Sequence, residues 1–225
     1  EAARRQSLIV VFDEFSGIAG VPGAAGVLRT ELQHHYSELG IVFAGSQPST
    51  MRMLFTDQAQ PFFAQADLVE IGPLRDEDVI AITEDGFAET NRDAGPTARH
   101  IAHFVRGHPQ RAMQLADATW RRTELGTTAT VETFEQALTD VRSSVDSGSE
   151  RLYAILPTGH QKALRVIAGG GSLYGTAADV LELAAGTATG ALQALIDNGS
   201  VAKVDGKNEI IDPLFADWIV RRFPI

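Results

Sequence analysis

The stretch Leu8-Ile9-Val10-Val11-Phe12-Asp13-Glu14-Phe15 places two adjacent acidic residues directly after a short apolar run. A run of this length that is rich in β-branched and aromatic residues is typical of a buried strand in a parallel sheet. The carboxyl ends of such strands form the edge at which open α/β sheets bind their ligands. The stretch therefore predicts a strand over 7–12 that presents the carboxylates of Asp13 and Glu14 at that edge.

Two acids in this position suit phosphoryl-transfer chemistry. Mg²⁺ prefers oxygen ligands, and in P-loop ATPases an acid at the end of a strand helps to hold the metal while a second group polarises the attacking water. Asp13 fits the first role and Glu14 the second. Read from these residues alone, the alternative is a buried strand that simply ends in two solvated acids.

A second apolar run, Ile41-Val42-Phe43-Ala44, is followed by Gly45-Ser46-Gln47. Apolar residues at helical spacing lie between the two runs, so strand, crossover helix and strand form a βαβ unit. Ser46 is then expected at the sheet edge beside Asp13 and Glu14, where its hydroxyl can sense a phosphate or orient water. The segment 67–71 predicts a third strand.

From Asp76 onward the apolar spacing becomes helical, with helices expected over 79–91, 96–106, 109–124 and 133–145. The polar, turn-prone segment 142–149 predicts a linker, with a domain boundary near residue 147. Helices are expected beyond it over 158–168, 177–184 and 187–198. Strands over 200–204 and 209–211 follow, and then a short helix that begins at Asp212-Pro213. Three helices followed by a β-hairpin predict a winged helix.

The composition excludes several classes of function. The 225 residues are 44% hydrophobic, carry a formal net charge of −10 and contain no cysteine. Disulfides and thiolate chemistry are therefore excluded, and a whole-protein electrostatic attraction to nucleic acid or anionic lipid is disfavoured. The absence of cysteine fits a reducing cytoplasm, and no stretch approaches the length of a membrane helix. We therefore expect a cytoplasmic protein with no membrane partner. Acidic and basic residues balance over 151–225, so the net charge belongs to 1–150.

Taken in order, these features resemble the STAND branch of the AAA+ ATPases, and the archaeal-type ATPases in particular. The resemblance implies that Asp13-Glu14 is the Walker B motif, in which Asp13 coordinates Mg²⁺ and Glu14 activates water. It also implies that the strand ending at Ser46 is the sensor 1 strand.

The same resemblance assigns roles farther along the chain. Gly107-His108-Pro109 looks like the Gly-x-Pro motif of the lid, whose proline lies against the adenine, and Arg111 is in the position of a sensor 2 arginine. Arg52 matches an arginine finger or pre-sensor arginine, the alternative being an ordinary solvated helix residue.

The fold class implied by the resemblance is α/β with an all-α lid and a winged helix. Residues 1–75 would be the C-terminal half of the ATPase core with an incomplete parallel P-loop sheet, 76–147 the helical lid, and 148–225 the winged-helix domain. The sequence contains no G-x-x-x-x-G-K-[ST] motif. We therefore expect an N-terminal P-loop segment of the same protein as a partner. ATP and Mg²⁺ are then cofactors of the intact protein, and this chain alone neither binds nor hydrolyses ATP.

The winged helix leaves two alternatives open. The expected recognition helix 187–198 has no Lys or Arg, and Lys203 and Lys207 are offset by Asp205 and Glu209. Since phosphate neutralisation supplies most nonspecific affinity, docking of a protein partner is favoured over DNA binding. The whole protein would be a regulatory switch. A DNA-binding transcription regulator and a non-catalytic interaction scaffold are the alternatives.

Overall fold

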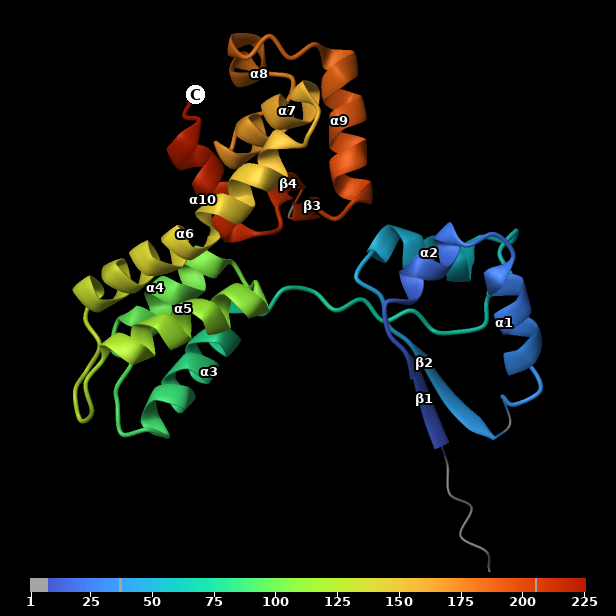
Figure 1. The fold of residues 1–225 in the computed structure, drawn as a ribbon, viewed down its shortest axis with the longest axis horizontal. Helices are drawn as coiled ribbons and strands as arrows, with labels where there is room; N and C mark the ends of the chain where they lie inside the picture. Colours follow the sequence, from blue (N-terminus) through green and yellow to red (C-terminus); the bar gives the residue numbers. More distant parts are fainter. Residues whose placement is uncertain (1–7, 37, 205) are drawn as a thin grey trace, which may run out of the picture. The chain divides into compact units, whose positions relative to one another are not determined.

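The computed structural model of the chain describes residues 8–36, 38–204 and 206–225, in two compact units. The first unit extends to Ile71, and the second covers Gly72–Ile196 and Ser200–Ile225 (Figure 1). Ser7 and Asp205, which belong to a predicted strand and a predicted turn, lie outside the described residues.

The first unit is built on a parallel pair of strands, β1 (Leu8–Phe12) and β2 (Leu39–Phe43), with Phe12 in register with Phe43. The 3-10 helix η1 (Phe15–Gly20) and α1 (Ala24–Leu32) connect them, and α2 (Pro48–Thr56) follows β2. The parallel pair with a helical crossover confirms the predicted βαβ unit.

Five phenylalanine side chains form the core of the first unit. The rings of Phe15 and Phe43 have centroids 4.4 Å apart, and Phe62 meets both of them edge-on and is fully buried. Phe12 and Phe55 complete the cluster. Because Phe15 follows Glu14 directly, its burial anchors the end of β1 and leaves the two acids at the surface.

The third strand predicted over 67–71 is wrong. The segment is extended but pairs with no strand among the described residues, where β1 and β2 pair only with each other. Val69 and Ile71 are 84% and 92% exposed. A strand requires a neighbour that satisfies its backbone groups, so an apolar β-rich pattern without a neighbour stays a single extended segment.

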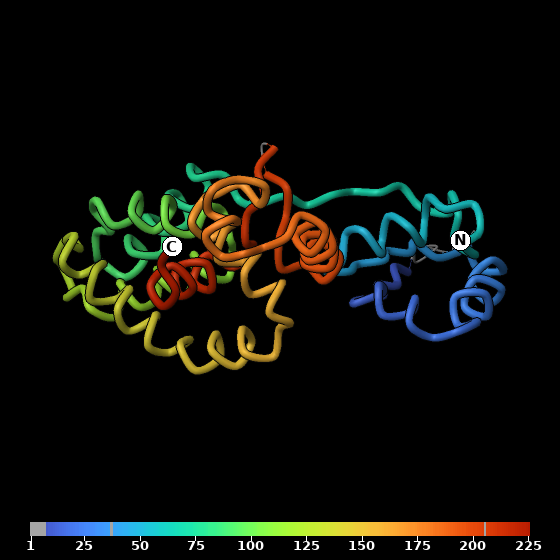
Figure 2. The backbone as a smooth tube through the Cα atoms, turned by 90° about the horizontal axis from the view of Figure 1, so that it is seen from above, coloured from blue at the N-terminus to red at the C-terminus, as the bar shows by residue number. Residues whose placement is uncertain are grey.

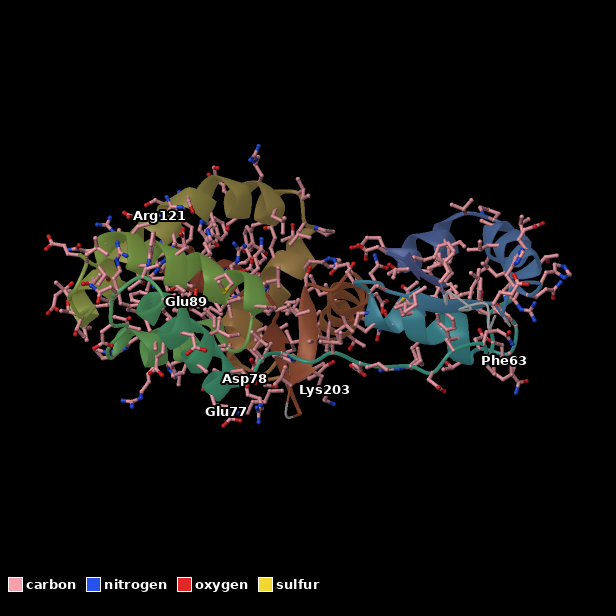
Figure 3. All side chains as sticks on the ribbon, turned by 90° about the horizontal axis from the view of Figure 1, so that it is seen from below. Phe63, Glu77, Asp78, Glu89, Arg121 and Lys203 are labelled. Atoms are coloured by element: carbon pink, nitrogen blue, oxygen red, sulfur yellow. The ribbon has the colours of Figure 1, made fainter. Side chains whose placement is uncertain are left out.

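The second unit begins with four helices, α3 (Asp76–Ala88), α4 (Thr97–Val105), α5 (Pro109–Arg122) and α6 (Val131–Ala154). Their apolar faces share one core, which includes the fully buried Ile101, Val105 and Leu115. At the start of α3 the acids Glu77 and Asp78 (Figure 3) both pair with Arg75. All four helices were predicted from the apolar spacing.

The linker predicted over 142–149 is wrong, because α6 runs through it without a break (Figure 2). Val141, Val145, Ser149 and Tyr153 recur at helical spacing, and all four are buried or partly buried. Helix propensity is a weak tendency that packing overrides. The serines between these positions lie on the solvent side, and the boundary expected near residue 147 falls inside a helix.

After α6 come α7 (Thr158–Ala168), α8 (Thr176–Val180) and α9 (Ala185–Asp197). The antiparallel strands β3 (Val201–Val204) and β4 (Lys207–Ile210) follow, and α10 (Pro213–Arg222) ends the chain. These elements surround a core that contains Leu164, Leu195 and Ile219. Leu214 of α10 instead joins the core of α3–α6, which ties the two parts of this unit together.

Candidate functional site

The predicted edge residues come together at the carboxyl ends of β1 and β2. Asp13 and Glu14 follow β1, Ser46 lies three residues beyond β2, and all three are exposed. The Ser46 hydroxyl donates a hydrogen bond of 2.8 Å to Oε2 of Glu14. The structure thus joins an acid and a hydroxyl that are 32 residues apart in the sequence.

The backbone between the strands explains this placement. The Phe15 amide donates to the Ala44 carbonyl at 2.8 Å, and the Ala44 amide donates to the Phe12 carbonyl at 2.8 Å. Glu14 turns the chain with a left-handed φ of 50°, which non-glycine residues adopt rarely and mostly at special sites. Asp13 Oδ1 accepts from the Glu14 amide at 2.9 Å. The turn is thus fixed by this hydrogen bond and by the one from the Phe15 amide to Ala44.

The donor chemistry of this edge fits Mg²⁺. Asp13 and Glu14 supply carboxylate oxygens and Ser46 a hydroxyl oxygen, and Mg²⁺ is bound through one or two carboxylates together with substrate phosphates and water. No cluster of three or more His, Asp or Glu side chains suited to a metal occurs within the described residues. A metal at this edge would therefore need phosphate and water oxygens as further ligands, and no phosphate-cradling motif exists in the sequence.

The Gly107-His108-Pro109 turn lies in the second unit, between α4 and α5. Gly107 is buried with φ +77°, and its carbonyl accepts from the Leu74 amide at 2.9 Å. A Cβ at this position would lie 2.2 Å from the Leu74 carbonyl oxygen. His108 caps α5 by accepting from the Arg111 amide, and the exposed Pro109 occupies the first turn.

Arg111, the sensor 2 candidate, is held by a carboxylate from the far end of the chain. Its Nε and Nη2 donate to the two oxygens of Asp212 at 3.0 and 2.6 Å, and Nη1 donates to Gln114 at 2.7 Å. Asp212 also caps α10 by accepting from the amides of Leu214 and Phe215.

Burial alone would raise the pKa of Asp212, but its hydrogen bonds outweigh this effect. The paired Arg111 guanidinium and the two α10 amides hold the pKa of Asp212 below its ordinary value. The carboxylate is therefore charged near neutral pH, where it pairs with the Arg111 guanidinium.

Arg52 lies on α2, and its guanidinium is 3.1 Å from a carboxylate oxygen of Glu70. Both side chains are well exposed, at 60% and 71%. This pair is an ordinary surface contact, and it neither requires nor prevents a role for Arg52 toward a second subunit.

Sequence reasoning missed the carboxylates of the C-terminal part that meet the Gly107 turn. Asp212 pairs with Arg111, and Glu209 of β4 pairs with Arg106 at 3.4 Å. These contacts span 101 and 103 residues. No periodicity or motif predicts a contact between residues so far apart in the sequence. The sequence did identify Asp212 as the residue before the proline that starts the last helix.

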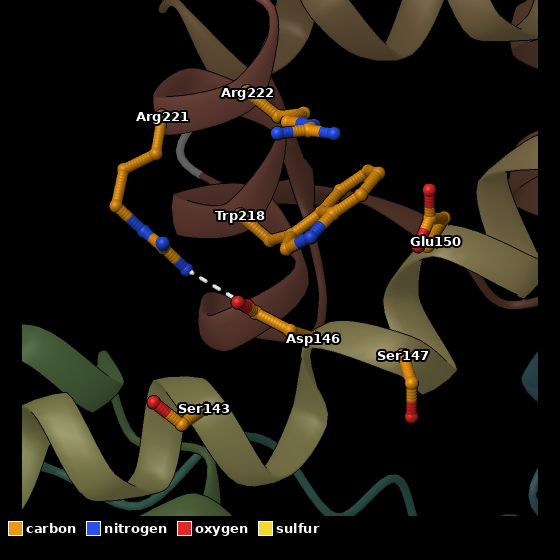
Figure 4. Close-up of a pocket in the computed structure, with 7 residues that line it drawn as sticks. All are labelled: Ser143, Asp146, Ser147, Glu150, Trp218, Arg221 and Arg222. Atoms are coloured by element: carbon orange, nitrogen blue, oxygen red, sulfur yellow. Dashed lines mark hydrogen bonds and ion pairs between the residues drawn. The ribbon is translucent and has the colours of Figure 1, made fainter.

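A separate groove lies between α6 and α10 (Figure 4). The Trp218 indole forms part of its wall, and Arg221 crosses it to reach Asp146 at 3.3 Å. None of the predicted site residues lines this groove. Among the described residues, no helix combines the length and the apolar composition needed to cross a membrane.

No protein-family profile matches the sequence, and no curated protein sequence matches it significantly. The solved structures that resemble the fold include two proteins from archaea. The Walker-type ATPase of Pyrococcus abyssi superposes with a TM-score of 0.71 at 20% identity, over 95% of this chain and 63% of that one. The ORC2 protein of Aeropyrum pernix, solved in ADPNP and ADP complexes, superposes with a TM-score of 0.56 at 15% identity, over 96% and 66% of the two chains.

These likenesses identify the class of fold. The chain has a fold similar to part of the Walker-type ATPase and of the ORC2 protein, which agrees with the resemblance found in the sequence. It spans just under two thirds of the length of either structure.

Proposed function

We propose that the chain is the C-terminal portion of a STAND-type AAA+ ATPase that acts as a nucleotide-dependent regulatory switch. The observation that carries the proposal is the Ser46–Glu14 hydrogen bond at the carboxyl end of a parallel strand pair. It brings together an acid that can polarise the attacking water and a hydroxyl that can orient that acid. The likeness of the fold to a Walker-type ATPase supports the assignment.

In the proposed reaction each edge residue has one task. Asp13 would hold Mg²⁺, which supplies neutralisation of phosphate charge when bound. Glu14 accepts a hydrogen bond from the attacking water and takes up its proton. Ser46 occupies one carboxylate oxygen of Glu14 and so leaves Oε1 to meet the water. This contact fixes the direction of the carboxylate, as a general base requires.

The phosphate-binding loop must come from outside this sequence. Two features support a missing strand: β2 pairs only with β1 among the described residues, and the extended segment 67–71 has no partner. The proposal places a P-loop strand beside β2, supplied by an N-terminal segment of the same protein. The 225-residue chain alone is then unable to bind or hydrolyse ATP.

The proposal also gives residues of the second unit a role in nucleotide recognition. Pro109 is exposed at the start of α5 and offers an apolar surface for adenine, while Arg111 offers a positive charge for phosphate. The buried Gly107 fixes the turn that presents both residues. Helices α3–α6 would be the lid, although α6 extends well past residue 147.

The elements from α7 to α10 would form the winged helix, with β3 and β4 as the wing. Helix α9, in the position of a recognition helix, contains Gly186, Gly190 and Thr187 but no Lys or Arg. Lys203 of the wing (Figure 3) faces Asn208 in the strand register. Because this surface offers few charges for phosphates, the proposal assigns it to a protein partner.

The test is turnover by the protein that contains this chain together with its P-loop segment. Glu14→Gln should abolish hydrolysis while ATP still binds, and Ser46→Ala should slow hydrolysis by about tenfold, as expected for the loss of one positioning contact. Glu38→Gln is the matched control, because Glu38 is exposed beside β2 but remote from the edge. Unchanged turnover in Glu14→Gln would refute the assignment.

A further inference from the structure

The carboxylate of Asp212 is bound to the guanidinium of Arg111, the group that the proposed function assigns to nucleotide phosphate. It meets Arg111 through two parallel hydrogen bonds of 3.0 and 2.6 Å, the geometry in which a guanidinium binds a carboxylate or a phosphate most strongly. The side chain of Arg111 is only 17% exposed in this state.

The side-on face of the Arg111 guanidinium, formed by Nε and Nη2, is fully occupied by Asp212. Nε and Nη2 point to Asp212, and Nη1 donates to Gln114 at 2.7 Å. A phosphate that used the same face of the guanidinium would have to displace the Asp212 carboxylate. Two anions beside one guanidinium also repel each other, which adds to the competition for this face.

Asp212 lies at the start of α10, so its release from Arg111 would change the contacts of the C-terminal part. It is the N-cap of α10, and the next residues contribute Leu214 to the core of α3–α6. A second pair, Arg106 with Glu209, ties the other side of the same turn to β4. Two ion pairs, one on each side of the Gly107 turn, thus connect this turn to the C-terminal part.

We infer that Asp212 is an intramolecular competitor of nucleotide phosphate for Arg111, so that phosphate binding and the α5–α10 contact exclude each other. The inference rests on the proposed function, since it needs Arg111 to meet the nucleotide. It makes Asp212 a positioning residue that acts through Arg111 and does not touch substrate. The α5–α10 contact is then the state without phosphate at Arg111, and nucleotide occupancy frees the C-terminal part.

The decisive variant is Asp212→Asn. Asparagine caps helices as well as aspartate does, so α10 keeps its first turn while Arg111 loses its charged competitor. Asp212→Ser keeps a capping oxygen on a side chain too short to hold Arg111, and it serves as a second version of the same change. The control is Asp217→Asn, also on α10, which breaks the pairs with Arg142 and Arg221 but leaves Arg111 untouched.

The readout is the Kd for ATP, measured by calorimetry in the presence of Mg²⁺, of the protein that carries its P-loop segment. Asp212→Asn and Asp212→Ser should tighten ATP binding by roughly five- to tenfold, as expected for the removal of one partly buried competing ion pair. Asp217→Asn should not change the Kd. In an Arg111→Gln background, Asp212→Asn should have no effect. A purely structural role of Asp212 would leave binding equal or weaker, never tighter.

The outcomes separate this inference from the proposed function. If Arg111→Gln weakens ATP binding but the Asp212 variants do not tighten it, competition is refuted and the ATPase assignment stands. Equal tightening by Asp217→Asn would also refute it, because general loosening of α10 would then explain the effect. If Arg111→Gln binds ATP as the wild type does, Arg111 does not meet the nucleotide and the inference falls. If the wild type binds no ATP, the inference and the proposed function fall together.

Discussion

Replacement of Gly107 by alanine tests how tightly the turn before α5 is built. Gly107 has φ +77°, a left-handed conformation that costs an L-residue about 1–2 kcal/mol. A Cβ would also lie 2.2 Å from the Leu74 carbonyl oxygen, so Pro73-Leu74 must move away. That movement breaks the 2.9 Å bond from the Leu74 amide to the Gly107 carbonyl, worth about 1 kcal/mol. Together these effects predict a loss of about 2–3 kcal/mol in the free energy of unfolding.

Urea unfolding followed by tryptophan fluorescence measures this loss. Both tryptophans, Trp120 and Trp218, lie in the second unit, so the signal reports the unit that contains Gly107. The matched control is Gly148→Ala, at an exposed position inside α6 where a Cβ meets nothing within 4 Å. Alanine there should stabilise the protein by about 0.5–1 kcal/mol. Equal unfolding midpoints for the two variants would refute the account of the turn.

Three further predictions concern the core, the charge pair and the exposed segment. Phe62→Ala should destabilise the first unit by about 3–5 kcal/mol because Phe62 is fully buried against three other rings. Phe63→Ala, at a side chain 39% exposed, should cost about 1 kcal/mol or less; hydrogen exchange of the β1 and β2 amides measures both, and similar effects would contradict the assigned core. Because the pKa of Asp212 is lowered in the folded state, its stabilising effect is complete above the ordinary carboxyl pKa of about 3.9 and is lost as pH falls through the folded value. The stability difference between wild type and Asp212→Asn, about 1–2 kcal/mol, should therefore be constant from pH 7 to 5 and shrink below pH 4 in urea titrations; a constant difference down to pH 2.5 would contradict the ion pair. Val69→Lys should leave the unfolding midpoint of the 225-residue chain unchanged, since Val69 is 84% exposed; a loss above about 1 kcal/mol would show that the segment is packed.

Local patterns were enough to predict that Glu14 and Ser46 meet at one edge of the strand pair. The apolar run before Asp13 and the one before Ser46 each carry the strand signal within a few residues. The parallel topology of a βαβ unit then brings their ends together. The turn at Gly107 was also predictable, because a glycine and a proline punctuate the chain there.

Two predictions failed because a local pattern does not include its neighbours. The segment 67–71 has the composition of a strand, but a strand exists only with a partner. Residues 142–149 have the composition of a linker, yet Val145 and Ser149 continue the inner face of α6. In both cases tertiary contacts, present or absent, decided the structure.

The Arg111–Asp212 pair lay beyond sequence reasoning for a different reason. From its position after the Gly-x-Pro turn, the sequence resemblance assigned Arg111 the role of a sensor 2 arginine and gave no partner for it. Its engagement by a residue 101 positions later follows only from the packing of α10 against α4 and α6. The structure shows Arg111 paired with Asp212. Binding of nucleotide phosphate by Arg111 remains the proposal.

The most direct test of the central claim is ATP affinity measured in two proteins by the same calorimetric titration with Mg²⁺. One is the 225-residue chain, and the other is the same chain preceded by its P-loop segment. The account predicts no micromolar binding by the first protein and micromolar binding by the second. Micromolar affinity of the 225-residue chain alone, or none in the extended protein, would contradict the claim that this chain is the C-terminal portion of an ATPase.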